Sequence, residues 1–230
     1  MHIAVKMGLD KTEGLSYPAF EVEELDFWIN EAIDRYVKTR YSGLNVKGES
    51  FEQSQKRTDD LRTLVEETRI VPTASFSNSD KPNLYLVDIS DFPADYMFFL
   101  NDEVYIQHDN EVTGATTHLR TSTTPCTSDT YSFMVNDPYS EHRLHLGTAK
   151  PLRMFTTKGV ELITDSLYSI EYYYMKYLRT PVTVVHSTGT DCDLPDHTHR
   201  EIVLLTVRIL IENIESQRYN TNTVEVTQSE

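Results

Sequence analysis

The middle of the chain, from about residue 75 to residue 185, differs in pattern from both ends, which show helical periodicity. Short apolar runs such as NLYLVDI, DYMFFLNDEVYIQHD, TYSFMVND, RMFTT and VELIT alternate with Pro, Gly, Asn, Asp, Ser and Thr, which is typical of strands and turns. No helical pattern in this block is long enough to serve as the crossover of a parallel sheet. The order therefore predicts an α+β protein, in which a helical, bundle-like domain is interrupted by a β-rich, sandwich-like insertion.

The segment from Phe20 to Gly43 has the clearest helical pattern at the front of the chain. Acidic residues fill its early turns and Lys38 and Arg40 its last turn, as the helix dipole favours. Its apolar face is predicted to consist of Val22, Leu25, Trp28, Ile29, Ala32, Ile33, Tyr36 and Val37.

Residues 50–72 carry a narrower apolar stripe in a very polar segment that ends at Pro72. The stripe comprises Phe51, Thr58, Leu61, Leu64 and Val65. We expect a second helix here, packed along one edge against the first.

Residues 202–214 are apolar at almost every position except a thin stripe that includes Glu201, Arg208 and Glu212. A helix with so narrow a polar strip is packed on most of its sides. The predicted organisation is 1–74 for the N-terminal helical part, 75–190 for the β-rich insertion, 191–215 for the C-terminal helix that completes the α domain, and 216–230 for an extended tail.

Two details of the β block are predicted. TTKGVELIT indicates a hairpin that turns at Lys158 and Gly159. In SIEYYYMKYL, Ile170, Tyr172 and Tyr174 alternate with Glu171, Tyr173 and Met175, so both faces of this strand are expected to be covered.

The composition excludes several classes of protein. With 36 acidic and 21 basic residues the formal charge is −15, which argues against a surface that grips nucleic acid. Only Cys126 and Cys192 occur, too few for a disulfide framework, so we expect folding in a reducing cytosol. No run approaches the roughly 20 apolar residues that span a bilayer, and the N-terminal segment lacks a signal-peptide pattern.

Cys192, His197 and His199 form the most concentrated group of metal-ligand residue types. Zinc sites usually bring four ligands in two close pairs, and here the other cysteine is distant. Side chains two apart on a helix also point in different directions. We therefore interpret DLPDHTHRE as a helix start, with Pro195 in the first turn, Asp193 or Leu194 as the cap and Asp196 at the positive end of the dipole. No metal is expected.

Catalytic patterns are weak throughout the sequence. The acidic pairs Glu23–Glu24, Asp59–Asp60, Glu66–Glu67 and Asp102–Glu103 are adjacent in sequence, and adjacent carboxylates rarely converge across a cleft. The histidines of the β block, among them His108, His118, His142 and His145, match no metal or catalytic spacing. Nucleophile-elbow, dinucleotide and phosphate-loop motifs are absent. We expect no enzyme activity and no cofactor.

Two segments are candidates for binding. The run YSIEYYYMKYL offers a Tyr-rich platform for a sugar or a peptide, or serves only sheet packing. The tail RYNTNTVEV either adds a strand to a neighbouring subunit or stays disordered.

WINEAIDRYVKTRYSG, FEQSQKRTDDLRTLV, YYMKYLRTP and LPDHTHREIVLLTVRILIENIESQRY together give the chain a resemblance to the head–tail connector proteins of tailed bacteriophages. It is most similar to the adaptor, or first ring, proteins of crAss-like phages. The resemblance spans most of the chain. In the β block it rests mainly on the general pattern of short apolar runs and turn residues.

The resemblance implies a homo-oligomeric ring of twelve copies in the virion, assembled in the host cytoplasm without contact with a membrane. The ring would lie beneath the portal protein, contact other connector rings and extend the DNA channel without binding DNA specifically. The resemblance also implies that the C-terminal segment reaches neighbouring subunits or the portal, through Arg218, Tyr219, Thr223, Val224 and Val226. The negative charge would then keep phosphates from adhering to the channel wall.

Two other functions remain open. A carbohydrate- or receptor-binding module of a phage tail would use the Tyr-rich β block. A hydrolase would use carboxylates dispersed along the chain, and its activity would be lost on replacement of a single Asp or Glu.

Overall fold

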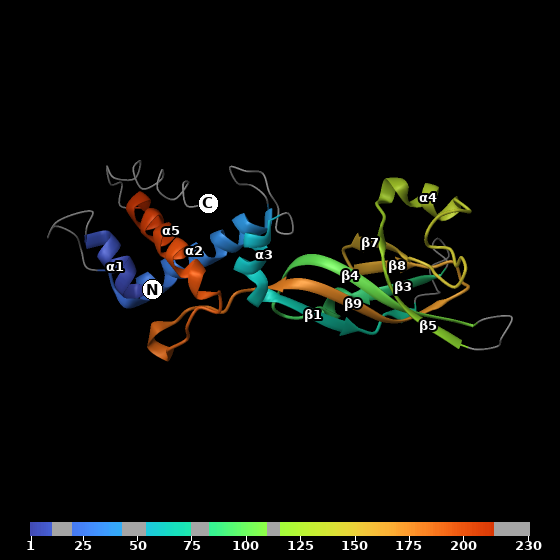
Figure 1. Cartoon of the computed structure of the whole chain (residues 1–230), viewed down its shortest axis with the longest axis horizontal. Helices are drawn as coiled ribbons and strands as arrows, with labels where there is room; N and C mark the ends of the chain where they lie inside the picture. The colour runs from blue at the N-terminus through green and yellow to red at the C-terminus, as the bar shows by residue number, and fades with distance from the viewer. Residues whose placement is uncertain (11–19, 43–53, 75–82, 110–115, 214–230) are drawn as a thin grey trace. The chain divides into compact units, whose positions relative to one another are not determined.

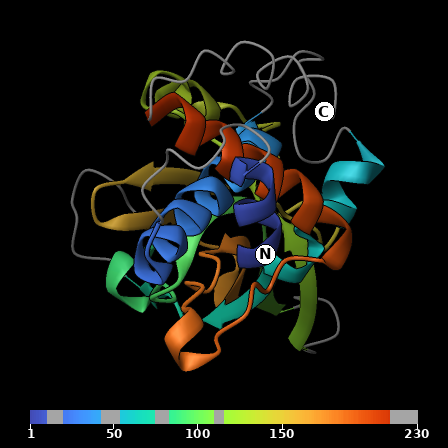
Figure 2. The same ribbon diagram turned by 90° about the vertical axis from the view of Figure 1, so that its left-hand side faces the viewer.

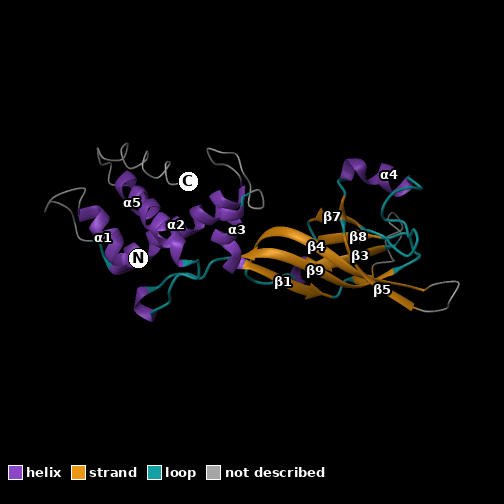
Figure 3. Cartoon of the chain, viewed as in Figure 1, coloured by secondary structure: helices purple, strands orange, loops and turns teal. Residues whose placement is uncertain are grey.

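The computed structural model describes residues 1–10, 20–42, 54–74, 83–109 and 116–213 (Figure 1). It is a mixture of helices and strands, which confirms the broad class predicted from the sequence. The chain divides into two compact units: a helical unit of residues 1–65 and 180–230, and a β unit of residues 66–179. Figure 3 shows the strands gathered in the β unit and α4 as the labelled helix among them.

The helical unit draws its helices from both ends of the chain. It comprises α1 (His2–Asp10), α2 (Val22–Ser42), α3 (Gln55–Leu61) and α5 (His199–Asn213). In Figure 2 the red ribbon of α5 lies beside the blue ribbons of α1 and α2, and α5 contacts both helices. Because segments about 170 residues apart share this core, neither end folds into it alone.

The two strongest helical patterns are confirmed. The core side of α2 is the face that the periodicity predicts, since its buried apolar residues are Leu25, Ile29, Ala32, Ile33, Tyr36 and Val37. The buried residues of α5 include Ile202, Val207, Leu210 and Ile211, whereas Val203, Leu204 and Leu205 are only half-buried. One side of α5 is therefore less enclosed than its composition predicts.

The second predicted helix is wrong over its C-terminal half. Helix α3 ends at Leu61, a 3₁₀ turn covers Arg62–Leu64, and β1 (Val65–Ile70) follows. The segment VEETRI contains the β-branched residues Val65, Thr68 and Ile70, which favour a strand, and it forms the edge of a sheet beside β9. Glu66, Glu67 and Arg69 lie between these residues and give the segment the polar pattern of a solvent-exposed helix face.

Two short helices were not predicted. Of the α1 residues whose burial is described, only Val5 is buried, so the apolar pattern of this helix is too sparse to recognise. Helix α4 (Ser128–Asn136) occupies TYSFMVND, which we predicted as a strand. Reciprocal bonds between Thr127 and Thr130 form a capping box, and Tyr131, Met134 and Val135 pack on one side of the helix.

The β unit consists of two sheets. One has the order β1-β9-β4-β5 and contains β4 (Tyr96–Asp109), β5 (Thr116–Ser122) and β9 (Ser169–Arg179). The other has the order β2-β3-β8-β7-β6, formed by β2 (Thr73–Ala74), β3 (Leu84–Asp88), β6 (Thr124–Pro125), β7 (Leu152–Thr156) and β8 (Gly159–Ile163). β6 pairs with β7 in parallel, whereas β3 pairs antiparallel with β2 and β8, β8 with β7, and β4 with β5 and β9.

Side chains from both sheets share one core. Tyr173 and Met175 of β9 and Val104 of β4 pack with Val87 of β3 and Leu162 of β8. The strands predicted at NLYLVDI, DYMFFLNDEVYIQHD, RMFTT and VELIT are confirmed.

The alternation predicted for β9 is interrupted by a bulge. Tyr105 pairs with Tyr172 and Ile106 with Ile170, so Glu171 is the extra residue. Ile170 therefore joins Tyr173 and Met175 in the core, and Tyr172 and Tyr174 are only half-buried. This corrects the prediction that Ile170 shares a face with Tyr172.

The hairpin predicted in TTKGVELIT is confirmed, but its turn lies one residue earlier than Lys158 and Gly159. Thr156 pairs with Gly159, so Thr157 and Lys158 form the turn. Gly159 has φ +138°, and a Cβ added to it would lie 2.1 Å from the carbonyl oxygen of Val87. Only glycine permits this approach of β8 to β3.

Candidate functional site

The candidate metal residues are occupied by other contacts. His197 Nε2 lies 2.9 Å from Asp60 Oδ1, and His199 Nε2 lies 3.0 Å from the carbonyl oxygen of Leu194. Burial raises the pKa of the Cys192 thiol, which favours its neutral form over the thiolate that binds metals. Within the described part of the chain, no three His, Cys, Asp or Glu side chains are grouped so that they could hold a metal ion.

The start of α5 differs in detail from the sequence prediction. Pro195 precedes a 3₁₀ turn, Asp196–Thr198, that leads into the helix, and no side chain caps this turn. The carboxylate of Asp193, which we expected as a cap, instead accepts a hydrogen bond from the Val182 amide at 3.2 Å. Asp193 therefore bonds to the segment that follows β9.

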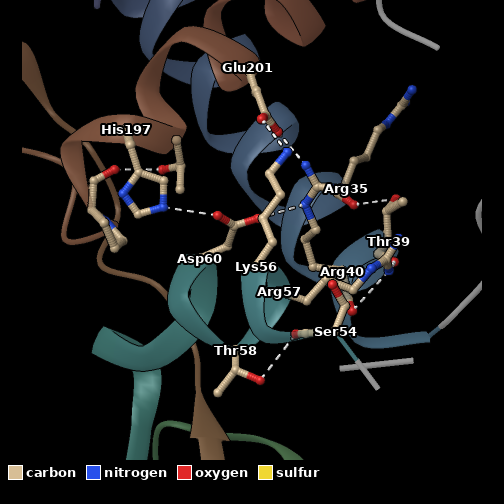
Figure 4. A network of polar contacts seen from close by, with 12 residues as sticks. Arg35, Thr39, Arg40, Ser54, Lys56, Arg57, Thr58, Asp60, His197 and Glu201 are labelled. Carbon is tan, nitrogen blue, oxygen red and sulfur yellow. Dashed lines mark hydrogen bonds and ion pairs between the residues drawn. The ribbon is translucent and has the colours of Figure 1, made fainter. Parts of the chain in front are cut away.

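An ion network with a buried centre, the pair of Arg40 and Asp60, links three segments of the helical unit (Figure 4). Arg40, in the last turn of α2, pairs with Asp60 of α3 (Nε to Oδ2, 3.2 Å) and with Glu201 of α5. Lys56 Nζ reaches the other oxygen of Glu201 at 3.1 Å, and His197 closes the network from the far side of Asp60. The network balances charges drawn from α2, α3 and the start of α5.

Arg57 adds a backbone connection to this network. Its guanidinium donates to the carbonyl oxygens of Thr39 and Arg40, each at 3.3 Å, beyond which α2 ends (Figure 4). The last carbonyl groups of a helix accept no hydrogen bond from within the helix, and the helix dipole places partial negative charge there, so a cation at this position is favourable. The C-terminus of α2 is thereby joined to α3.

A second buried ion pair connects the two sheets of the β unit. Asp102 of β4 accepts hydrogen bonds from Arg153 of β7 at 2.7 Å and from Thr123 at 2.6 Å. The Arg153 guanidinium lies over the rings of Phe99 and Phe155, at 4.5 and 5.0 Å from their centroids. Burial raises the pKa of Asp102, although Thr123 and Arg153 both stabilise its charged form.

The Tyr-rich run contributes to a charged aromatic surface on the four-stranded sheet. Arg69 covers the ring of Tyr172 at 4.7 Å, and Arg120 covers the ring of Tyr174 at 4.2 Å. Tyr105 stacks on His118 at 5.5 Å. Since these ring faces are in contact with other side chains, they do not offer the open aromatic platform considered from the sequence.

Two carboxylates hold Arg120 in place. Arg120 bonds to Glu67 at 2.9 Å and to Glu103 in the next strand, and Lys176 approaches Glu67 at 3.7 Å. Members of two of the sequence's acidic pairs thus serve as cross-strand ion-pair partners.

The tail residues expected to contact partners are Arg218, Tyr219, Thr223, Val224 and Val226. All five lie outside the described residues. Sequence reasoning also missed the roles of Arg40, Asp60, Asp102 and Arg153. For Arg40 the sequence holds one signal: it lies three and four positions after Val37 and Tyr36 and so continues their apolar face. A charged residue on such a face is buried with a partner of opposite charge.

Comparison with known proteins identifies the class. A family model described as phage tail ring protein 3/4 matches residues 9–223 of the 230 residues, and no curated protein matches the chain. The match defines a structural ring component of a phage tail assembly. The chain belongs to the phage tail ring protein 3/4 family, the ring proteins of crAss-like phages, and this confirms the part of the resemblance that concerns a ring protein of these phages. The match does not extend to the adaptor, or first ring, proteins to which the sequence was judged most similar.

Family membership makes the chain a component of the virion. Among the described residues, no helix is long and apolar enough to cross a bilayer.

Proposed function

We propose that the chain is one subunit of a stacked ring in the head–tail connector, which joins capsid to tail and prolongs the DNA channel. The family match over nearly the whole chain carries this proposal. The helical unit serves as a body into which the β unit is inserted, so that each unit offers its own surface to neighbouring subunits.

The proposed ring has twelve copies and belongs to the stack that begins at the portal protein. The number in the family description, 3/4, supports a layer further along this stack than the first ring. Its partners are then the portal-side assembly above, the tail rings below and sister copies around the ring.

The proposed role for the charge of −15 is to keep the channel wall from binding phosphate. DNA then passes without specific contact. The proposal requires that acidic side chains outnumber basic ones on the surface that faces the lumen.

We further propose that the protein is not an enzyme. The support is that Asp60, Asp102 and His197 are held in ion pairs or hydrogen bonds within the fold. Glu67 and Glu103 are likewise bound to Arg120. These side chains are used for cohesion of the protomer.

Electron microscopy of purified particles tests the ring proposal. A ring density between capsid and tail into which both units fit is the expected result, and its rotational symmetry gives the copy number. A particle in which this chain forms a fibre or a receptor-binding tip would contradict the proposal and favour the carbohydrate-binding alternative.

Incorporation of variants tests the proposed tail contacts. Val224→Asp and Val226→Asp together are expected to reduce incorporation into particles, whereas Gln228→Asp, a charge added in the same segment, leaves it unchanged. Equal incorporation of the double variant and the Gln228→Asp control would show that the tail does not contact partners in the particle.

A further inference from the structure

The connection between β6 and β7 displays three large apolar side chains to solvent. Phe133 of α4 is 75% exposed, Tyr139 is 87% exposed and Leu146 is fully exposed. We refer to these three residues as the apolar tip. One side of α4 packs against Leu84, Leu152 and Ile163 of the five-stranded sheet through Tyr131, Met134 and Val135, whereas Phe133 does not take part in that contact (Figure 3). A concentration of exposed apolar side chains on one excursion of the chain indicates an interaction site.

The backbone holds Leu146 in place at a conformational cost. His145 and Thr148 exchange two backbone hydrogen bonds of 2.9 Å, so Leu146 and Gly147 form a two-residue turn. Both have positive φ, +51° and +80°. Asn, Asp or Gly fits the first of these positions far better than leucine does. A bulky apolar residue kept there without burial indicates a contact outside the protomer.

The tip is fastened to the rest of the β unit. Arg143 donates to the carbonyl oxygens of Val135 and Asp137, each at 3.0 Å, which joins the turn segment to the end of α4. The amide of Leu144 donates to Asp165 at 2.7 Å. These contacts hold the tip in a fixed position and lower the entropy lost when it binds.

A groove of about 400 Å³ in the same unit is lined mainly by apolar side chains. Its walls include Ile89, Phe92, Tyr96 and Phe155. Ile89 and Phe155 are more than half exposed, which is unusual for side chains of this size.

The Leu146 turn of the tip and the groove lie at opposite ends of strand β4. Gly147 approaches His108 near the end of β4, since a Cβ added to it would lie 3.5 Å from His108 Nε2. Tyr96, in the groove, begins the same strand. The twelve-residue separation corresponds to roughly 35–40 Å along a strand.

We propose that the apolar tip of one copy inserts into the apolar groove of the next copy around the ring. The inference rests on the proposed ring function. A contact between two different apolar patches, one on each copy, is heterologous, which is the type of contact that closes into a ring. The occupant of the groove is therefore a second copy of this chain.

Charge substitutions at exposed positions separate the two halves of the contact. Leu146→Asp disables the tip and Ile89→Asp disables the groove. Val71→Asp adds the same charge to a side chain that is 66% exposed and belongs to neither patch. Sedimentation of the full chain over a range of concentrations should show each of the first two variants associating at least about tenfold more weakly than the control.

Mixing the two defective variants identifies the kind of contact. An equimolar mixture retains one intact tip and one intact groove, so it should form dimers and nothing larger. Failure of the mixture to form dimers, or association of either variant as strong as that of the control, overturns the proposal.

Cross-linking detects the contact where association is weak. Leu146→Cys in one chain and Ile89→Cys in another, differently tagged, should be joined by a short bismaleimide, while Leu146→Cys alone should give only background. Homodimers from Leu146→Cys alone, or no mixed product at the highest concentration, overturn the inference. A ring seen in particles together with that result would leave the ring function standing and assign its contacts to other surfaces.

Discussion

The guanidinium of Arg40 lies 3.2 Å from the carboxylate of Asp60, and the two side chains are 3% and 1% exposed. They come from α2 and α3, and Glu201 of α5 completes the charge balance. Because water does not reach the pair, removal of one partner leaves a buried charge without compensation.

Arg40→Met is therefore expected to lower the free energy of unfolding by about 3–5 kcal/mol. Arg35→Met is the matched control on the same helix, since Arg35 bonds to Glu31 at an exposed position and should cost less than about 1 kcal/mol. Urea denaturation followed by circular dichroism gives both values. Adding Asp60→Leu to Arg40→Met should recover part of the loss in free energy of unfolding. Equal losses in Arg40→Met and Arg35→Met would show that Arg40 is not buried in solution.

Comparison of alanine substitutions at Gly159 and Gly189 separates the cost of a steric clash from the cost of a positive φ. Both have positive φ, but a Cβ on Gly159 would meet the Val87 carbonyl oxygen whereas a Cβ on Gly189 meets nothing within 4 Å. Gly189→Ala should cost about 1–2 kcal/mol, and Gly159→Ala about 4 kcal/mol or more. Thermal denaturation compares them, and similar losses would contradict the close approach of β8 to β3.

The sequence predicted those elements whose stabilising contacts repeat at a regular period. α2 and α5 present long apolar faces, and the hairpin of β7 and β8 has a local turn signal, so each was recognised. β1 was assigned to a helix because its charged residues imitate a polar helix face, and only the neighbouring strand β9 decides its conformation. The bulge at Glu171 is likewise set by its pairing with β4, a strand distant in sequence.

The contacts of the candidate residues depend on sequence separations that no motif encodes. His197 lies beside Cys192 and His199 in the sequence, yet its partner is Asp60, 137 positions away. Asp102 and Glu103 are adjacent, but one binds Arg153 inside the β unit and the other binds Arg120 on its surface. Opposite faces of one strand give neighbouring carboxylates different roles.

Arg153 tests whether the tie between the sheets depends on a planar cation. Its guanidinium lies over Phe99 and Phe155 and bonds to Asp102, which a compact ammonium group cannot do in the same way. Arg153→Lys should lower the free energy of unfolding by about 1–3 kcal/mol. Arg179→Lys, which alters one ion pair with the half-exposed Glu66, should cost less than about 1 kcal/mol. Equal losses would mean that charge alone holds the sheets together.

His142 makes stability depend on pH. Burial, then the nearby charge of Arg143, lowers the pKa of its imidazole, while Asp165 and Asp137 act in the opposite direction. Its Nδ1 lies 2.9 Å from Ser140 Oγ in the interior of the β unit. The imidazole of the unfolded chain binds a proton near pH 6.5, as unperturbed histidine does, and that of the folded chain binds one only at lower pH.

Between those two pH values the unfolded chain holds more protons, so stability rises with pH and falls on acidification. One group gives a slope of at most about 1.4 kcal/mol per pH unit. His142→Gln should reduce the slope below pH 6.5, measured by urea denaturation at successive pH values. Val71→Thr, an exposed change that does not titrate, should keep the wild-type slope. An unchanged slope in His142→Gln would show that the imidazole is protonated to the same extent in the folded and unfolded chains, which requires water to reach it within the β unit.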